Sequence, residues 1–277
     1  MKIFRKMPDT NEVRSLYQDG YLHELLKGFI DAIENHKTSV VIAIDGRSGL
    51  GKTTMGNQIA ITLDKDFCLH KIFYNPQEFL TGLSNAKKGD CLMFDEAMLI
   101  SSRSALSSIN RMIVQAMSMI RSKNIYVIFC INSIFDLDKN LAISRADLLL
   151  HIYSESLIKR GNFCAFFKGK DGRDRIKELY LYGKKFYDYN KPKANFIGTF
   201  TKEFVVDEQE YEKQKQIGVD AFLTGKIGTQ TQVAYKTRNQ MIARLHNEGW
   251  DVKKLMEYSG LSRTEIYKIV AKEGNDA

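Results

Sequence analysis

The sequence lacks long apolar runs, closely paired cysteines and low-complexity tracts. Its apolar runs are the length of single strands, which argues against a membrane-spanning segment. The first eight residues lack the apolar region that a secretory signal peptide needs. No CxxC pair occurs, so we expect the cysteines to be buried thiols in a reducing compartment. These absences predict a soluble protein of the cytoplasm, or of the host cytoplasm if the gene is viral.

The composition supports a folded protein and suits a nucleic-acid partner. At 277 residues the chain has room for one large domain and a smaller one. Hydrophobic residues make up 44% of it, enough for a substantial core. The formal net charge is +8, a balance that favours nucleic-acid binding without establishing it.

A glycine-rich stretch, GRSGLGKT at residues 46–53, organises the chain. It follows the apolar run 39–45 and precedes a helical pattern, which is the arrangement of a phosphate-binding P-loop. Backbone N–H groups and the helix N-terminus would converge on phosphate oxygens. Lys52 would contact the β- and γ-phosphates of ATP, and the Thr53 hydroxyl would ligate Mg²⁺. The expected nucleotide-binding residues are Gly46, Arg47, Ser48, Gly49, Leu50, Gly51, Lys52, Thr53 and Thr54. The alternative is a glycine-rich turn without a ligand, which a match at all four fixed positions disfavours.

The apolar run 91–94 is followed by two carboxylates, Asp95 and Glu96. This is the form of a Walker B segment. Asp95 would hold the Mg²⁺ together with Thr53, and Glu96 would act as the catalytic base that polarises the attacking water. Hydrolysis needs such a base, whereas a small-molecule kinase takes its nucleophile from the substrate.

Strands and helices alternate from residue 38 to residue 152, which predicts a mostly parallel sheet covered by helices on both faces. Helical spacing predicts helices at 21–33, 77–83 and 104–121, and apolar runs predict strands at 39–45, 67–74, 91–94, 125–131 and 148–152. Asn132 ends the run 125–131 and would lie between the P-loop and Walker B strands. It would either sense the γ-phosphate or be an ordinary strand-end residue.

Two arginines precede the last two of these strands. Either Arg121 or Arg145 could complete the catalytic site of a neighbouring subunit as an arginine finger. The alternative is that both are surface residues.

Residues 153–205 differ in character and predict a small β-rich extension, with short strands at 163–167, 178–182 and 185–187. The segment 157–193 holds eleven Lys or Arg and four Asp or Glu, interleaved with aromatic residues. Such a stretch could follow a phosphate backbone. The alternative is a solvated extension whose aromatic residues pack on the ATPase core, which we favour for the aromatics.

The carboxyl-terminal part predicts a separate DNA-binding domain. Residues 206–232 would form a charged helix and a linker, and residues 233–277 a three-helix helix-turn-helix domain of the kind found in resolvases and transposases. Ser262 would cap the last helix, with Leu261, Ile266 and Ile269 in the core. The expected DNA-binding residues are Ser262, Arg263, Thr264, Tyr267 and Lys268. A protein-binding module of the same shape is the alternative.

An extra strand between the P-loop and Walker B, and a glutamate after the Walker B aspartate, resemble the RecA/AAA+-like branch of P-loop ATPases. Over residues 38–152 the layout resembles the HerA/FtsK-type ATPases, including the Zot-type ATPases of phages. The resemblance implies a ring hexamer that moves DNA, with ATP at subunit interfaces. Many relatives have Gln where this chain has Asn132, which departs from the family pattern.

The full expectation is an α/β P-loop NTPase with residues 1–37 as a helical lead-in, 38–205 as the ATPase domain, 206–232 as helix and linker, and 233–277 as the DNA-binding domain. Its function would be an ATP-hydrolysing motor that translocates or remodels DNA for a virus or plasmid. The alternative is an ATP-switched DNA-binding adaptor with slow turnover, such as a transposition or partition helper. A nucleotide or small-molecule kinase fits less well, because of Glu96 and the carboxyl-terminal domain.

Overall fold

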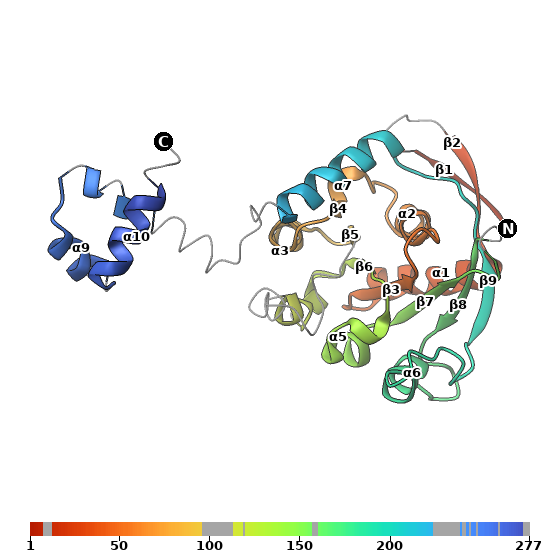
Figure 1. Ribbon diagram of the computed structural model, residues 1–277. Coiled ribbons are helices and arrows are strands. Elements are labelled where there is room, and N and C mark those ends of the chain that lie inside the picture. The colour runs from red at the N-terminus through yellow and green to blue at the C-terminus, as the bar shows by residue number, and fades with distance from the viewer. Residues whose placement is uncertain are drawn as a thin grey trace. The chain divides into compact units, whose positions relative to one another are not determined.

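The computed structural model describes residues 1–7, 13–95, 113–118, 120–156, 160–223, 239, 242–243, 245–247, 249–259 and 261–273. The chain divides into two compact units, Met1–Asp220 and Ala221–Ala277, and each is described by itself (Figure 1). Glu96 and most of the predicted helix at 104–121 lie outside the described residues. No described helix is both long enough and apolar enough to cross a membrane.

The first unit is built on one large mixed sheet. In the described part of the chain its strand order is β4-β5-β6-β3-β7-β8-β9. The strands are β3 (Val40–Gly46), β4 (Ile72–Phe73), β5 (Cys91–Phe94), β6 (Tyr126–Cys130), β7 (Leu148–Tyr153), β8 (Asn162–Phe166) and β9 (Phe196–Thr199). The pairs among β4, β5, β6, β3 and β7 are parallel, and β8 and β9 continue the sheet in antiparallel pairing. Strand β6 lies between β3 and β5, which confirms the predicted extra strand.

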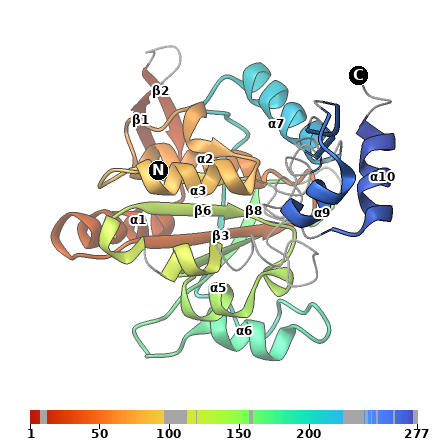
Figure 2. The same cartoon turned by 90° about the vertical axis from the view of Figure 1, so that its left-hand side faces the viewer.

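Helices cover both faces because the central strand is apolar on both sides. Val40, Ile42 and Ile44 of β3 belong to one core cluster, and Val41 and Ala43 to the other. The first face packs against α1 (Gly20–Asn35) and α2 (Lys52–Leu63), and the second against α3 (Pro76–Asn85), α5 (Lys139–Ser144) and α6 (Arg175–Gly183). Figure 2 shows α2 on one side of β3 and β6, with α5 and α6 on the other. The fold is thus a parallel α/β sheet with helices on both faces.

Two predictions for the amino-terminal half were incomplete. The lead-in holds the expected helix α1, but before it strands β1 (Lys2–Lys6) and β2 (Val13–Tyr17) pair in antiparallel register. The predicted strand at 67–74 is reduced to the two residues of β4, because Leu69–Lys71 form a 3₁₀ turn. That turn carries the Lys71 ammonium to Asp64 and Asp90, at 2.6 and 2.8 Å.

The extension after β7 is less β-rich than predicted. The strand expected at 163–167 is confirmed as β8, but residues 178–182 form part of helix α6 and residues 185–187 lie in a turn. Asp174 caps α6 by accepting a hydrogen bond from the Lys177 N–H. Buried residues of α6 recur at helical spacing, at Ile176, Leu179, Tyr180 and Gly183. The strand prediction was wrong because it followed the aromatic content and overlooked this spacing.

Helix α7 (Glu208–Leu223) is longer than predicted and belongs to the first unit as far as Asp220. It continues through Gly218, where the sequence predicted a linker. The buried side chains Val205, Val206 and Tyr211 anchor this part of the chain on the core of the α2 face. The unit boundary at Asp220 therefore falls inside α7.

The second unit holds a small apolar core. Its helices include α9 (Val252–Ser259) and α10 (Arg263–Glu273), and residues 242–243 and 245–247 are also helical. Ile242, Val252, Leu255 and Ile266 are buried together, with Leu261 and Ile269 packed against them. Ser262 and Glu265 form a reciprocal capping box at the start of α10, which confirms the predicted cap.

Candidate functional site

The P-loop leaves β3 and enters α2 through three glycines in the left-handed half of backbone space. Gly46, Gly49 and Gly51 have φ of 138°, 76° and 100°. A Cβ on Gly46 would lie 2.3 Å from the Ile152 carbonyl oxygen, so only glycine fits there. Gly51 is the N-cap of α2 and supplies no side-chain acceptor to the first N–H groups of the helix. The loop therefore offers backbone donors and a helix N-terminus to an anion, which fits a nucleotide phosphate.

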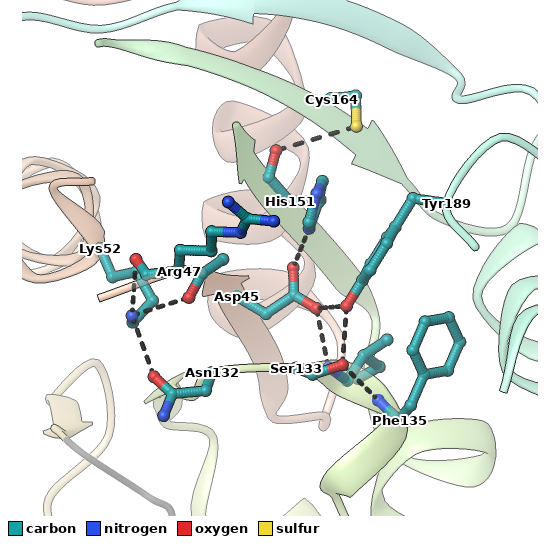
Figure 3. A network of polar contacts seen from close by, with 11 residues as sticks. Asp45, Arg47, Lys52, Asn132, Ser133, Phe135, His151, Cys164 and Tyr189 are labelled. Carbon is teal, nitrogen blue, oxygen red and sulfur yellow. Dashed lines mark hydrogen bonds and ion pairs between the residues drawn. The ribbon is translucent and has the colours of Figure 1, made fainter. Parts of the chain in front are cut away.

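Lys52 lies at the centre of the loop (Figure 3). Its ammonium donates to the carbonyl oxygens of Gly46 and Arg47, at 2.8 and 3.2 Å. It also donates to the Asn132 side-chain oxygen at 3.2 Å. Asn132, which follows β6, therefore contacts the P-loop lysine, and its role as a sensor of the γ-phosphate stays a prediction.

Thr53 and Asp95 meet beneath the loop. The Thr53 hydroxyl donates to Asp95 Oδ2 at 3.0 Å. Asp95 follows β5 directly and is only 2% exposed, and its own N–H donates to the Phe73 carbonyl oxygen at 2.9 Å. A hydroxyl beside a buried carboxylate is a donor set that suits Mg²⁺, so the residues present fit the predicted metal.

A second hydroxyl, from Tyr211 of α7, completes this cluster, and the sequence analysis did not predict it. Tyr211 donates a hydrogen bond to Asp95 Oδ2, and its oxygen lies 3.3 Å from Thr53 Oγ1. Its ring packs between Tyr74 and Phe204, at centroid distances of 5.8 and 5.1 Å. Burial, and then the Asp95 carboxylate, raise the pKa of the Tyr211 hydroxyl, so it stays a neutral donor.

The only sequence signal for Tyr211 was its place as an isolated aromatic residue within the charged stretch 207–215. A single aromatic residue on a charged helix indicates a buried contact but does not identify the residue that the ring contacts. The partner, Asp95, is 116 positions away.

A second network lies around Asp45, the residue that precedes Gly46 (Figure 3). Asp45 is fully buried, and its Oδ2 accepts hydrogen bonds from the Ile134 N–H at 2.7 Å and from the Tyr189 hydroxyl. His151 Nδ1 lies 2.8 Å from Asp45 Oδ1, and because a carboxylate only accepts, this nitrogen donates. The imidazole also stacks on the Tyr189 ring, at 3.6 Å between centroids and 17° between planes.

This network connects the P-loop to its two neighbouring strands. His151 is paired with Asp45 across β3 and β7. Ser133 follows Asn132, and its hydroxyl lies 3.0 Å from the Tyr189 hydroxyl. Burial, and then the Asp45 carboxylate, raise the pKa of Tyr189, which therefore also remains a neutral donor. The start of the P-loop is fixed by side chains from three separate segments.

The two candidate arginine fingers lie at the opposite edge of the sheet from the P-loop. Arg121 is in the turn that precedes β6, and Arg145 ends α5 just before β7. Both therefore lie at the amino ends of parallel strands whose carboxyl ends form the nucleotide site. Arg121 is exposed, and Arg145 donates to the Ser118 carbonyl oxygen at 3.4 Å. Neither arginine reaches the P-loop of its own chain, so a finger role would require a neighbouring subunit.

The predicted DNA-binding residues share one property. Ser262, Arg263, Thr264, Tyr267 and Lys268 are all exposed at the start of α10, whereas Ile266 between them is buried. The Arg263 guanidinium lies 6.0 Å from the centre of the Tyr267 ring. The structure thus separates these residues from the core residues as the sequence predicted, and their contact with DNA stays a prediction.

The strand order, the glycine loop and the Thr53–Asp95 contact define the first unit as a P-loop NTPase fold. No protein-family model and no curated protein matches the sequence.

Solved structures with a similar layout include the RuvB Holliday junction branch migration motor of Thermotoga maritima. This match has 20% identity, covers 52% of this chain and 48% of that one, and has a TM-score of 0.34. In this match the chain thus spans about half the length of the RuvB chain. The N-terminal domain of zonular occludens toxin from Neisseria meningitidis matches at 19% identity over 63% of this chain and 98% of that one, with a TM-score of 0.39. The FIGL-1 AAA domain in complex with ADP matches at 14% identity over 73% and 87%, with a TM-score of 0.36. Similarity at this level assigns neither a family nor an activity.

Proposed function

We propose that this protein is an ATP-hydrolysing, DNA-binding motor that translocates or remodels DNA for a virus or plasmid, in the cytoplasm of its cell or host. The observation that carries the ATPase part is the contact of Thr53 with Asp95 directly below a glycine loop that holds Lys52. A glycine-rich turn without a ligand needs neither a buried carboxylate at that place nor a lysine inside the loop.

The residues of the loop have distinct tasks in this proposal. The backbone donors of residues 46–53 and the Lys52 ammonium bind the phosphates of ATP. Thr53 and Asp95 hold the magnesium ion, which when bound supplies positive charge against the β- and γ-phosphates. Asn132 is hydrogen-bonded to Lys52, and in this proposal it senses the γ-phosphate.

Glu96 is the proposed catalytic base. It directly follows Asp95 in the sequence, which is the position of the base in a Walker B segment. In this role it accepts a proton from the water that attacks the γ-phosphate. Arg121 or Arg145 would stabilise the transition state in the site of a neighbouring subunit, which requires a homo-oligomer, with a ring hexamer favoured.

The DNA part rests on the second unit. The exposed residues of α10 include Arg263 and Lys268, which can pair with phosphates or base edges, and Thr264, which can hydrogen-bond to either. The capping box fixes the start of α10, and Ile266 ties the helix to its core. A fixed helix with a polar, basic outer face is the element that helix-turn-helix domains place in the major groove.

Two measurements test the ATPase proposal. We expect the full-length protein to hydrolyse ATP in a Mg²⁺-dependent reaction that DNA stimulates. The Glu96→Gln variant should retain ATP while its turnover falls by at least about a hundredfold, since it keeps the phosphate-binding residues and loses only the base. Absence of ATPase activity with and without DNA, together with unchanged nucleotide retention in Glu96→Gln, would refute the proposal.

One observation favours a second candidate, an ATP-switched DNA-binding adaptor. Helix α7 contacts Asp95 through Tyr211 and continues into the chain that leads to the second unit. Such a connection could report the nucleotide state without fast turnover. Directional displacement of a protein block bound to DNA distinguishes the two functions, because a motor produces it and an adaptor does not.

The oligomeric state is a separate measurement. Native mass determination with a non-hydrolysable ATP analogue and DNA should give a sixfold mass for the motor. A dimer or an open filament under those conditions would favour the adaptor.

A further inference from the structure

The last residues of helix α6 and the turn after it carry exposed aromatic side chains, and we name residues 181–187 the aromatic–lysine turn. Tyr182 and Phe186 are 75% and 74% exposed, which is high for rings of this size. Lys184 and Lys185 lie between them in the sequence. Contiguous exposed apolar area on a folded unit usually marks a binding surface.

The packing of α6 explains why the Tyr182 ring points outward. Ile176, Leu179 and Tyr180 occupy the buried stripe of α6, and the Tyr180 hydroxyl donates to the Leu137 carbonyl oxygen at 3.0 Å. Leu181 and Tyr182 follow that stripe on the outer side of the helix, where 49% and 75% of their area is exposed. Their exposure therefore follows from the packing of α6 and not from a loose chain end.

A tight reversal brings Phe186 back to the end of the helix. The N–H groups of Phe186 and Asp188 both donate to the Gly183 carbonyl oxygen, at 3.1 Å each. A Cβ on Gly183 would lie 2.4 Å from the Asp188 carbonyl oxygen, so a larger residue would not permit this reversal. Tyr182 and Phe186 therefore flank one short turn.

Among the described residues around the turn, the arginines are paired with carboxylates, but the lysines are not. The nearby arginines are neutralised, because Arg173 pairs with Glu178 and Arg175 pairs with Asp171. Within the described part of the chain, by contrast, no carboxylate pairs with any of the five lysines Lys177, Lys184, Lys185, Lys191 and Lys193. The turn therefore keeps a positive charge that an external anion can use.

Two of the lysines are held beside aromatic rings. The Lys184 ammonium donates to the Tyr180 hydroxyl at 2.6 Å and lies 4.5 Å from the centre of that ring. The Lys185 ammonium lies 5.2 Å from the centre of the Phe186 ring. Rings that can stack and ammonium groups that can pair with phosphate thus alternate within a few residues, as bases and phosphates do along a single strand.

We propose that the aromatic–lysine turn binds single-stranded DNA, with bases stacked on Tyr182 and Phe186 and phosphates paired with Lys184 and Lys185. This inference rests on the proposed function for its choice of DNA, and it adds a second contact for DNA, on the ATPase unit itself. Paired bases do not offer their faces to such rings, so the turn selects single strands over duplex.

The residues that follow Phe186 connect the turn to the P-loop through side-chain contacts. The Tyr187 ring packs on Phe135 at 5.4 Å, and its hydroxyl donates to Asp136 at 2.7 Å. Two residues further on, Tyr189 donates to Asp45, the residue before Gly46. DNA bound at the turn would therefore lie at one end of a packed segment whose other end fixes the P-loop.

The test measures binding of a labelled oligo-dT of about twenty nucleotides to the full-length protein by fluorescence anisotropy. The double variant Tyr182→Ala/Phe186→Ala should bind at least about tenfold more weakly, since base stacking on an aromatic ring is worth about 1–3 kcal/mol per base. Lys185→Gln should reduce the slope of log affinity against log salt by about 0.7. Phe4→Ala removes another ring, one that is 66% exposed on β1, and should leave binding unchanged.

Three results would overturn the inference. The first is oligo-dT affinity within twofold of the parent in the double variant, provided that its melting temperature is also unchanged. The second is tighter binding of oligo-rU than of oligo-dT, which would assign the turn to RNA. The third is loss of binding to phosphatidylserine vesicles in the double variant with oligo-dT binding retained, which would assign it to a membrane surface.

The readouts keep this inference separate from the proposed function. ATP hydrolysis is measured on the same samples without DNA. A protein that binds oligo-dT through these rings but never hydrolyses ATP would refute the ATPase and support the turn. Duplex binding is followed with Lys268→Gln, which should weaken duplex affinity and leave oligo-dT affinity unchanged, because Lys268 lies in the second unit.

Discussion

Two buried aspartates flank the P-loop, and each accepts a hydrogen bond from a tyrosine that enters late in the chain. Asp45 ends the strand before the loop and is bound by Tyr189, whereas Asp95 ends strand β5 and is bound by Tyr211. Both carboxylates are at most 2% exposed. They nevertheless have different surroundings, and from this difference we infer a structural role for Asp45 and a functional one for Asp95.

Asp45 is surrounded by groups that fix it in place. A backbone N–H and an imidazole nitrogen donate to it besides the phenol, and each comes from a separate segment of the chain. Asp95 is instead bound by the hydroxyls of Thr53 and Tyr211, and hydroxyl oxygens can also accept or coordinate. We therefore expect substitutions at Asp45 to change folding and substitutions at Asp95 to change chemistry.

The largest expected effect is on catalysis at Asp95. Asp95→Asn preserves shape and removes the charge that holds the metal, so ATP turnover should fall about a thousandfold, or roughly 4 kcal/mol of transition-state stabilisation. The free energy of unfolding, from urea denaturation, should change by less than about 1 kcal/mol. A large loss of stability with normal turnover would reverse the assignment of the two aspartates.

The matching substitution, Asp45→Asn, should act on folding. The side-chain NH₂ group of the introduced asparagine would face one of the three groups that now donate hydrogen bonds to Asp45. We therefore expect the free energy of unfolding to fall by about 3 kcal/mol. For a unit of this size that lowers the melting temperature by roughly 6–12 °C. Calorimetry of the apo protein measures this shift. An unchanged melting temperature would show that the network around Asp45 does not stabilise the fold.

The two tyrosines provide a conservative version of the same comparison. Tyr211→Phe removes one donor to Asp95, and we expect the Mg²⁺ concentration for half-maximal nucleotide binding to rise about tenfold, as for other partners of metal ligands. Tyr189→Phe should leave that concentration unchanged and lower the free energy of unfolding by about 1–2 kcal/mol. Binding of a fluorescent ATP analogue across a Mg²⁺ titration separates the two.

Tyr74→Phe is the matched control for Tyr211→Phe. The Tyr74 ring lies 5.8 Å from Tyr211, but in the described part of the chain its buried hydroxyl makes no hydrogen bond. Its removal should therefore change neither the Mg²⁺ dependence nor stability by much. A lowered Mg²⁺ requirement in Tyr211→Phe alone would show that the phenol competes with the metal instead of orienting Asp95.

The smallest expected effect concerns carboxylates at the other end of β5. Burial acts to raise the pKa of Asp90, but hydrogen bonds from the Lys71 ammonium and the Lys87 N–H hold that pKa below its usual value. A carboxyl group whose pKa is lower in the folded state stabilises the fold at pH values above its unfolded-state pKa of about 3.9. This stabilisation is lost as the pH falls through and below that value.

We therefore expect the unfolding free energy to decrease between about pH 4.5 and pH 3, with a contribution from Asp90 below about 1 kcal/mol because the group is partly exposed. In Lys71→Gln the contribution of Asp90 to the pH dependence of the unfolding free energy should be smaller. Urea denaturation at several pH values measures it. ATP turnover at neutral pH should not change, since Lys71 contacts neither Asp45 nor Asp95. An identical acid dependence in parent and variant would contradict this account of Asp90.

Most of the nucleotide site could be predicted from the sequence because its signals are local. Glycines at fixed spacing before Lys52 and Thr53 predicted the loop, and an apolar run before Asp95 predicted the strand that ends beside it. Strand β6 and its terminal Asn132 followed from the alternation of apolar runs and helical spacing. The structure confirmed that β6 separates β3 from β5 and that Asn132 meets Lys52. The path of α6 was missed, since its helical spacing was outweighed by aromatic residues typical of strands.

The sequence alone predicted a phosphate-binding loop, a magnesium-binding pair and a separate basic helical unit, because each prediction rests on a short stretch. Only the tertiary structure decided that Tyr211 binds Asp95 and that Tyr189 and His151 bind Asp45. These pairs are 116, 144 and 106 positions apart. A hydrogen bond between residues so distant leaves no periodicity or spacing in the sequence, since it depends on how the sheet and its covering helices pack.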